Sequence, residues 1–212
     1  MVIAAEQTAG RGRRGRNWFA SPGDSLTFSL LWRFAPGTAP AGLSLAVGVA
    51  VVRALAKVGA GEAALKWPND ILQDGRKLGG ILVELLPGAP HAAVIGIGIN
   101  LHLPPGMPGD VRAASAALCA AGESTDENDL YAALLGELLA VLEIFAVQGF
   151  AALRPEWLAH HAFQDAHISL VSDFDTPRPG ICRGVDSDGA LLLDVDGGIE
   201  RVLSGEVSLR PA

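Results

Sequence analysis

Two long segments with helical periodicity lie within a chain whose other apolar residues mostly follow the periodicity of β-strands. In residues 43–58, Leu45, Val49 and Val52 recur at helical spacing, and residues 129–147 carry a second amphipathic pattern of this kind. Residues 25–32 instead alternate between apolar and polar side chains, as in a strand with one buried face. This mixture predicts an α+β fold in which helices pack on a sheet.

Shorter apolar runs and turn residues predict the remaining elements of this first region. Further strands are expected at residues 2–6, 63–67, 77–86 and 92–100, and a short helix at residues 150–160. The last two strands would form a hairpin through residues 87–90. The helix at residues 129–147 would be capped by Ser124, Thr125 or Asp126.

The pattern changes near Asp165. From there on the chain contains short β runs at residues 168–171, 180–185, 190–195 and 199–203, separated by turn residues. We therefore expect two domains, residues 1–164 and residues 165–212, of which the second is a small β-barrel or β-sandwich.

Composition excludes several classes of protein. The 212 residues are half hydrophobic and carry a formal net charge of −7, which excludes a disordered chain. The longest uncharged apolar stretch, residues 43–52, ends at Arg53 and is too short to span a bilayer, so we expect neither a membrane protein nor a leader peptide. Cys119 and Cys182 lie far apart, without the spacing of a disulfide scaffold or a zinc site, which fits a reducing cytoplasm.

Four of the 16 basic residues fall within six positions, and glycines lie among them. These residues are Arg11, Arg13, Arg14 and Arg16. Residues 10–15 match the letters of a dinucleotide-binding turn, but loop-forming residues follow where that turn requires a helix. The segment predicts a mobile loop that binds phosphate or carboxylate and that an anionic ligand orders. A solvated basic loop or a nucleic-acid-binding patch is the alternative interpretation.

Lys66-Trp67-Pro68-Asn69-Asp70 brings a cation, an amide and a carboxylate together at the end of an expected strand. Binding sites often lie at such strand ends. The alternative is a turn in which Asn69 and Asp70 only cap the local backbone.

Glycines on two neighbouring strands predict a flat slot over the sheet. Gly79 and Gly80 follow Lys77 on one strand, and Gly96 and Gly98 remove side chains from one face of the next. A close helix–sheet contact or β-bulges would require the same glycines. The five histidines have no metal-ligand spacing, and no nucleophilic triad is present, so charge stabilisation of a bound anion is the expected chemistry.

Taken together, four segments resemble the biotin protein ligase family in their order and spacing. They read EQTAGRGRRGRNW at residues 6–18, KWPND at 66–70, RKLGGILVE at 76–84 and GIGIN at 96–100. Residues 205–210, GEVSLR, resemble the end of the C-terminal domain of that family. The resemblance covers nearly the whole chain. It implies an α+β catalytic domain with a mixed sheet, similar to class II synthetases, followed by a small SH3-like β-barrel.

The resemblance also implies a reaction. Biotin would attack Mg-ATP to give biotinyl-AMP and pyrophosphate, and a lysine of a biotin carboxyl carrier protein would then attack this intermediate. The resemblance therefore implies an enzyme of the biotin–[acetyl-CoA-carboxylase] ligase type, and we expect it to be cytoplasmic.

Site residues follow from the resemblance position by position. The catalytic residues would be Lys77 and Arg13. The biotin-binding residues would be Gln7, Gly10, Arg11, Arg13, Lys77, Gly80, Gly96 and Gly98. The ATP-binding residues would be Arg13, Arg14, Arg16, Trp18, Lys66, Asn69, Asp70, Asn100, Glu206 and Arg210, with Trp18 on the adenine side. Asp70 would meet magnesium through the phosphates.

The chain also departs from the family pattern. In the family, a helix and a strand with a Ser/Thr-Thr/Ser-Asn motif precede the arginine segment, whereas here Met1 lies just before it, so we expect one wall of the biotin pocket to be missing. No helix-turn-helix is expected, and hence no DNA-binding role. A catalytically weak binder of biotin or biotinyl-AMP is a second hypothesis. A lipoate or octanoate transferase is a third, which the arginine segment argues against. Homodimerisation through the edge of the strand at residues 92–99 is a further expectation.

Overall fold

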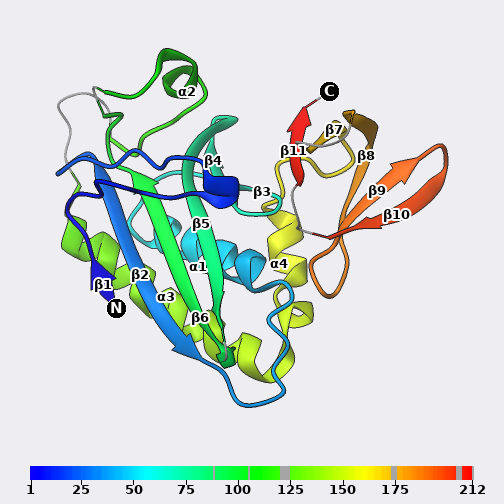
Figure 1. The fold of residues 1–212 in the computed structure, drawn as a ribbon, viewed down its shortest axis with the longest axis horizontal. Helices are drawn as coiled ribbons and strands as arrows, with labels where there is room; N and C mark the ends of the chain where they lie inside the picture. The colour runs from blue at the N-terminus through cyan, green and yellow to red at the C-terminus, as the bar shows by residue number, and fades with distance from the viewer. Residues whose placement is uncertain (88, 105, 120–124, 173–175, 204–206, 212) are drawn as a thin grey trace.

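The structure, a computed structural model, describes residues 1–87, 89–104, 106–119, 125–172, 176–203 and 207–211. A six-stranded sheet and a five-stranded sheet form its two main parts (Figure 1). The first sheet contains β1 (Val2–Ile3), β2 (Ser25–Arg33), β3 (Ala64–Lys66), β4 (Asp70–Gln73), β5 (Arg76–Leu86) and β6 (Ala89–Asn100), in the order β1-β2-β6-β5-β4-β3. The helices are α1 (Leu43–Lys57), α2 (Gly109–Ala113), α3 (Glu127–Gln148) and α4 (Arg154–Ala159), with short 3-10 helices at Arg13–Gly15 and Phe150–Ala152.

The second sheet follows α4. It contains β7 (His167–Ser172), β8 (Arg178–Val185), β9 (Leu191–Val195), β10 (Gly198–Val202) and β11 (Val207–Pro211), in the order β10-β9-β8-β7-β11. This sheet is the expected small β domain, called the small domain below. The proposed boundary between residues 164 and 165 stays a prediction, and the first strand of the small domain begins at His167.

The α+β class is confirmed, but the larger sheet is not mixed. Every pair of its described strands is antiparallel. β5 and β6 form the expected hairpin, and β3, β4 and β5 follow one another through tight turns, which favour antiparallel pairing. Strand β4 was not predicted, since its four residues directly follow the turn after Pro68.

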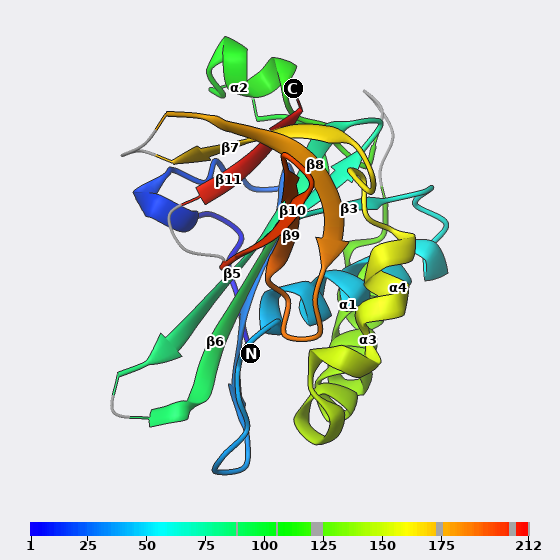
Figure 2. The same cartoon turned by 90° about the vertical axis from the view of Figure 1, so that its right-hand side faces the viewer.

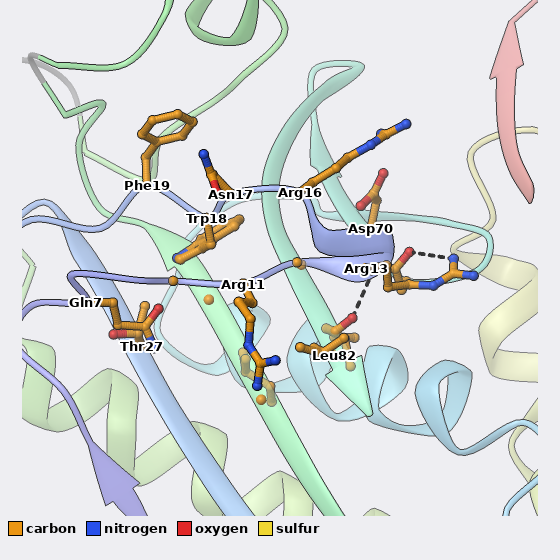
Figure 3. A pocket seen from close by; sticks show the side chains of 18 of the residues that line it. Gln7, Arg11, Arg13, Arg16, Asn17, Trp18, Phe19, Thr27, Asp70 and Leu82 are labelled. Atoms are coloured by element: carbon orange, nitrogen blue, oxygen red, sulfur yellow. Dashed lines mark hydrogen bonds between the residues drawn. The ribbon is translucent and has the colours of Figure 1, made fainter. Parts of the chain in front are cut away.

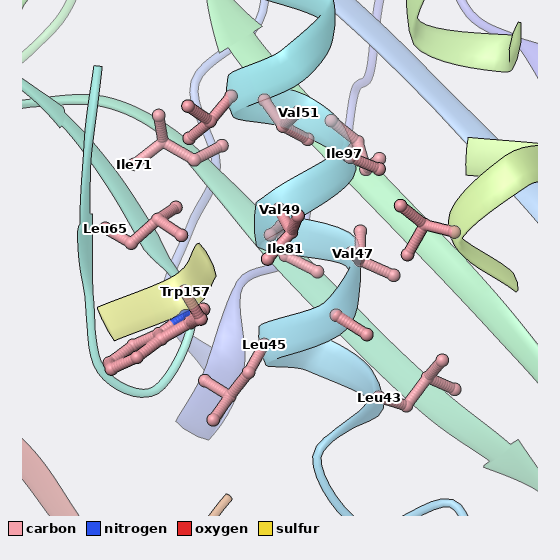
Figure 4. Close-up of a cluster of buried hydrophobic side chains, with 14 of the residues drawn as sticks. Leu43, Leu45, Val47, Val49, Val51, Leu65, Ile71, Ile81, Ile97 and Trp157 are labelled. Carbon is pink, nitrogen blue, oxygen red and sulfur yellow. The ribbon is translucent and has the colours of Figure 1, made fainter. Parts of the chain in front are cut away.

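Helix α1 lies at the centre of the core (Figure 4). Its sequence predicted one apolar face, yet residues on nearly every side of it are buried. The physical reason is its position between the six-stranded sheet and α3 (Figure 2). Ile81 of β5 and Ile97 of β6 point toward α1 (Figure 4), so this face of the sheet is filled by core side chains.

Helix α3 begins at the predicted cap. The Asp126 carboxylate accepts hydrogen bonds from the backbone N–H groups of Asn128 and Asp129, whereas Ser124 lies outside the described residues. By length and composition, α3 is the one described helix that meets the criteria for a membrane span. However, 39% of its most apolar window is buried, and core helices meet the same criteria, so this finding is weak.

The two sheets are joined by direct contacts and share one hydrophobic core. Arg154, at the start of α4, donates to the backbone oxygen of Val185 in β8 at 2.7 Å. His161 follows α4 and lies between the backbone oxygen of Leu65 in β3 and the thiol of Cys182 in β8. The small domain is therefore fixed to the end of the larger sheet that carries β3.

Candidate functional site

A cavity of about 820 Å³ lies on the face of the larger sheet opposite α1. Alternation along β6 explains the division between the two faces, because Ile95, Ile97 and Ile99 are buried while Gly96, Gly98 and Asn100 line the cavity. Residues 6–19 run across this face and cover it (Figure 3). The turn at residues 66–70 and part of the loop around α2 complete the wall.

The predicted glycine slot is present, and the indole ring of Trp18 lies on it. Gly80 of β5 pairs with Gly98 of β6, and Gly96 pairs with Leu82. A Cβ atom on Gly98 would lie 2.5 Å from the Trp18 ring, so only glycine permits this contact. The ring therefore separates the cavity wall near Gly96 from the wall near Asn100. The indole nitrogen of Trp18 is buried and has no hydrogen-bond acceptor among the described residues.

Neutral polar groups of β2 lie beside the glycines of β6, because Thr27 pairs with Gly98 and Ser29 pairs with Gly96. Gln7 lies beside Thr27 of β2 (Figure 3), and Ser29 lines the same wall. The Thr27 hydroxyl donates to the backbone oxygen of Ala4 at 2.8 Å, which holds the covering segment against the sheet. The sequence reasoning did not select Thr27 or Ser29, although the alternation along β2 places them opposite the buried Leu26 and Phe28.

The turn at residues 66–70 and β5 bring two lysines to one carboxylate. Lys77 Nζ lies 2.5 Å from Asp70 Oδ1, and Lys66 Nζ lies 3.0 Å from Asp70 Oδ2. Burial acts to raise the pKa of Asp70, but the two ammonium groups lower it below its ordinary value overall. Asp70 is therefore ionised, and the cluster carries one net positive charge. Lys66, Asp70 and Lys77 were all predicted site residues, and the structure brings them together.

Arg13 reaches the same turn from the arginine segment. Its Nη1 donates to Asn69 Oδ1 at 3.3 Å, and Asn69 Nδ2 donates to the backbone oxygen of Ile81 at 2.9 Å. Burial lowers the pKa of Arg13, and the neighbouring Arg14 and Arg16 act in the same direction, while Asp70 opposes them. A guanidinium stays charged in proteins, and burying its charge is costly, so the partly buried Arg13 favours the binding of an anionic ligand.

The other arginines of the segment are placed differently. Arg11, Arg14 and Arg16 also line the cavity. Arg11 lies 4.0 Å from Glu84 of β5, with both side chains largely exposed, which makes this a weak pair. Arg16 is exposed. Gly10 is needed here because a Cβ atom would lie 2.5 Å from the backbone oxygen of Trp18.

Lys77 is also held through its backbone. Its N–H donates to Ala114 O at 2.9 Å, and its carbonyl accepts from Ala116 N at 2.8 Å, so residues 114–116 run beside the start of β5. Asn100 Nδ2 donates to Ala116 O at 2.9 Å. The buried Asn100 therefore both lines the cavity, as predicted, and fixes the segment beside Lys77.

The loop around α2 supplies an apolar part of the wall that the sequence reasoning did not resolve. Met107 and Val111 line the cavity together with Ser115. Arg112 of this loop donates to Leu103 O at 3.0 Å and to Pro104 O. It therefore braces the loop and is not itself among the lining residues.

Two predicted ATP-binding residues lie in the small domain. Arg210 is exposed on β11 and is not among the described residues that line the cavity. Glu206 lies outside the described residues. No group of three or more His, Cys, Asp or Glu side chains that could hold a metal ion occurs in the described part of the chain.

Fold and cavity define a protein of two domains whose larger antiparallel sheet carries a cationic cavity on one face. The model of the biotin/lipoate A/B protein ligase family matches residues 1–100, and that of the biotin protein ligase C-terminal domain matches residues 179–210. The biotin–[acetyl-CoA-carboxylase] ligase of Paracoccus denitrificans is 33% identical over 97% of this chain and 88% of its own length. The chain belongs to the biotin protein ligase family.

Further relatives agree with this assignment. The bifunctional ligase/repressor BirA of Escherichia coli is 43% identical over 99% of this chain, which spans 66% of the length of that relative. The solved structure of the biotin protein ligase from Aquifex aeolicus in complex with biotin and ATP matches with a TM-score of 0.86 at 28% identity. This match covers 99% of the present chain and 88% of the other chain.

Proposed function

We propose that this chain is an ATP-dependent ligase that attaches biotin to a lysine of a biotin carboxyl carrier protein. In the first step, a carboxylate oxygen of biotin bonds to the α-phosphorus of ATP and pyrophosphate leaves, which gives biotinyl-AMP. In the second step, the neutral lysine amine attacks the carbonyl carbon, AMP leaves and the amine loses a proton. The site residues keep the roles predicted above.

One observation carries this proposal: Asp70 pairs with Gly80 and Gly80 with Gly98 beneath Trp18, so the Lys66–Asp70–Lys77 cluster lies in the cavity wall level with that ring. Arg13 reaches the adjoining Asn69 in the same wall. Two anions must approach each other in the first step, and their repulsion has to be offset by fixed cations. The wall near Gly96 and Gly98, with Gln7, Thr27 and Ser29, suits the neutral polar ring system of biotin. The compartment near Asn100, with the apolar side chains of Met107 and Val111, suits the adenosine part.

Magnesium would enter with ATP. In nucleotide sites Mg²⁺ is usually held by one or two carboxylates together with phosphate oxygens, without a cage of protein ligands. Asp70 is an ionised carboxylate in the cavity wall, but both of its oxygens are paired with Lys66 and Lys77, so a contact with magnesium there would require one of these ion pairs to open. The ion would neutralise charge on the phosphates.

A second cavity of about 490 Å³ supports the transfer step. It shares five lining residues with the first cavity, namely Arg13, Trp67, Pro68, Asn69 and Ile81. Its other lining residues are mainly apolar and come from the start of α1 and the segment before it, the outer half of β5 and the small domain. An acceptor lysine entering here would reach the intermediate past Arg13. A cytoplasmic location, where ATP and the carrier protein occur, is part of the proposal.

The experiment that tests this function is mass-spectrometric detection of biotinyl-AMP after incubation of residues 1–212 with biotin and Mg-ATP. Product equal to or above the amount of enzyme, followed by biotinylation of a carrier-protein domain, is the expected result. Biotin binding without any product would instead support the weak binder. Transfer of a lipoyl or octanoyl group, without reaction of biotin, would support the transferase.

A further inference from the structure

Trp67, in the turn that carries Asn69 and Asp70, is bound directly to the small domain. Its indole N–H donates to the backbone oxygen of Gly189 at 3.1 Å, between residues 122 positions apart in the chain. The Trp67 side chain is fully buried. A buried hydrogen bond of this kind is costly to lose, because no water replaces the missing partner.

The turn that presents the Gly189 oxygen is itself held firmly. Asp186 Oδ1 accepts from the backbone N–H of Asp188 at 3.2 Å and of Ala190 at 3.0 Å. Arg201 of β10 forms ion pairs with both Asp186 and Asp188. The position of this carbonyl is therefore fixed by the small domain and does not depend on Trp67.

The same turn packs against the first turn of α1. Gly189 has a φ of +87°, and a Cβ atom there would lie 2.9 Å from both the Gly42 Cα and a Leu45 methyl. Next to this contact of Gly189 with Gly42 and Leu45, which we call the corner, the Ser44 hydroxyl donates to the backbone oxygen of Pro68 at 3.2 Å. The small domain, α1 and the turn at residues 66–70 are therefore in contact at this one place.

The residues that follow Trp67 at this corner line the cavity. Two residues after Trp67, Asn69 accepts from Arg13, and its backbone oxygen accepts from Ile81 N at 2.9 Å. Asp70 then pairs with Lys66 and Lys77. Any tilt of the turn at Trp67 moves these groups together relative to the glycine floor.

We propose that Trp67 is a positioning residue through which the small domain sets the nucleotide side of the site. The inference rests on the proposed function, because it assumes that Asn69 and Asp70 face ATP. Trp67 itself touches no reacting atom in this proposal. Its effect is specific: ATP binding depends on the Trp67–Gly189 contact, whereas biotin binding on the Gly96 side does not.

The test compares Trp67→Phe with Trp32→Phe in the full chain. Trp67→Phe removes an indole N–H that donates to the Gly189 oxygen. Trp32→Phe removes a buried indole N–H that has no acceptor among the described residues. ATP is titrated calorimetrically into protein saturated with biotinol, the alcohol that lacks the reacting carboxylate, and biotin is titrated separately. We expect ATP affinity to fall about fivefold to tenfold in Trp67→Phe only, as for one lost hydrogen bond, with biotin affinity unchanged in both.

Gly189→Ala provides a second route that leaves the Trp67 core intact. The added methyl group pushes the turn away from Gly42, so the same selective loss of ATP affinity is expected. If either folded variant retains full ATP affinity, or loses ATP and biotin affinity equally, Trp67 is a structural residue only and the inference is wrong. A wild-type chain that binds ATP but forms no biotinyl-AMP would overturn the proposed function and leave this comparison valid.

Discussion

Lys77 is the residue whose removal should affect the first step most. Its ammonium group lies over Gly80 beside the Trp18 ring and is held by Asp70, while its backbone is held by residues 114–116. We expect Lys77→Ala to lower biotin-dependent pyrophosphate release by about 10²–10³-fold, because a preorganised charge at the reacting phosphate is lost. Lys57→Ala is the control, since this exposed lysine pairs with Glu137 on the opposite face of the sheet. An unchanged rate in Lys77→Ala would remove Lys77 from the mechanism.

His161 provides a prediction about pH. Burial lowers its pKa to about 4, only partly opposed by its hydrogen bond to the backbone oxygen of Leu65. Its Nδ1–H donates to Leu65 O, so Nε2 accepts from the Cys182 thiol and the ring is neutral in the folded chain. The unfolded chain binds a proton near pH 6.5, so this contribution to stability is complete above that pH and falls toward pH 4.

We therefore expect the free energy of unfolding to fall by about 2 kcal/mol from pH 7 to pH 5, through this one group. Urea denaturation at several pH values measures it. The slope should be much flatter in His161→Gln and unchanged in His102→Gln, which alters a partly exposed histidine. A slope that persists in His161→Gln would assign the pH dependence to other groups.

At the scale of single residues, the sequence predicted charged and glycine positions better than neutral ones. Lys66, Asp70 and Lys77 are grouped in short motifs. Charged side chains are rarely buried unless they are paired, so in a cavity wall these three are expected to pair with one another or with a ligand. Thr27 and Ser29 lie in an ordinary alternating strand, where nothing local separates a cavity wall from a solvent-facing surface. The placement of Trp18 on Gly98 depends on long-range packing and was not predictable from spacing.

Among the elements, the arginine segment is the one with the most specific expected behaviour. It covers the cavity, and Arg13 anchors it to Asn69. We expect Arg13→Gly to release biotinyl-AMP early, because a charge-assisted contact to the phosphate is lost and the cover is no longer tied down. Biotinylation of bystander lysines, for example on serum albumin, should rise roughly tenfold or more, as expected for the loss of a charge-assisted bond.

Arg178→Ala is the matched control for this measurement, because Arg178 lies exposed on β8 and pairs only with Glu200 among the described residues. Equal leakage from both variants and wild type would mean that the segment does not retain the intermediate. The related expectation, that an anionic ligand orders this segment, stays a prediction.

Element prediction succeeded where hydrophobic patterns were long. α1, α3 and the β5–β6 hairpin were all expected from the sequence, and each has a strong apolar pattern. β4 and α2 were not expected, because a four-residue strand holds only two repeats of its pattern and a five-residue helix holds fewer than two turns. Their existence depends on neighbours: β4 pairs with β3 and β5, and α2 is braced by Arg112.

At the scale of the whole molecule, the expected dimer edge was placed on the wrong strand. β6 pairs with β2 on one side and β5 on the other, so residues 92–99 cannot bind a second copy. The error has a simple cause, because an apolar run indicates burial but gives no order of strands. In the described part of the chain, no strand pairs with the outer edge of β5 beyond Ile81. Residues 82–86 therefore present one free edge; residues 30–33 of β2, which extend beyond β1, present another among the described strands.

We expect two copies to pair through the edge of β5. Leu85, on the edge, is 47% exposed, and Leu85→Lys would place like charges close together across a twofold axis. Light scattering after size exclusion should show a dimer for wild type and a monomer for Leu85→Lys. Leu139→Lys, at an exposed leucine of α3, should behave as wild type. Each copy carries a net charge of −7, so screening of their repulsion should increase the dimer fraction at higher salt. A wild-type monomer at every concentration and salt would exclude this interface.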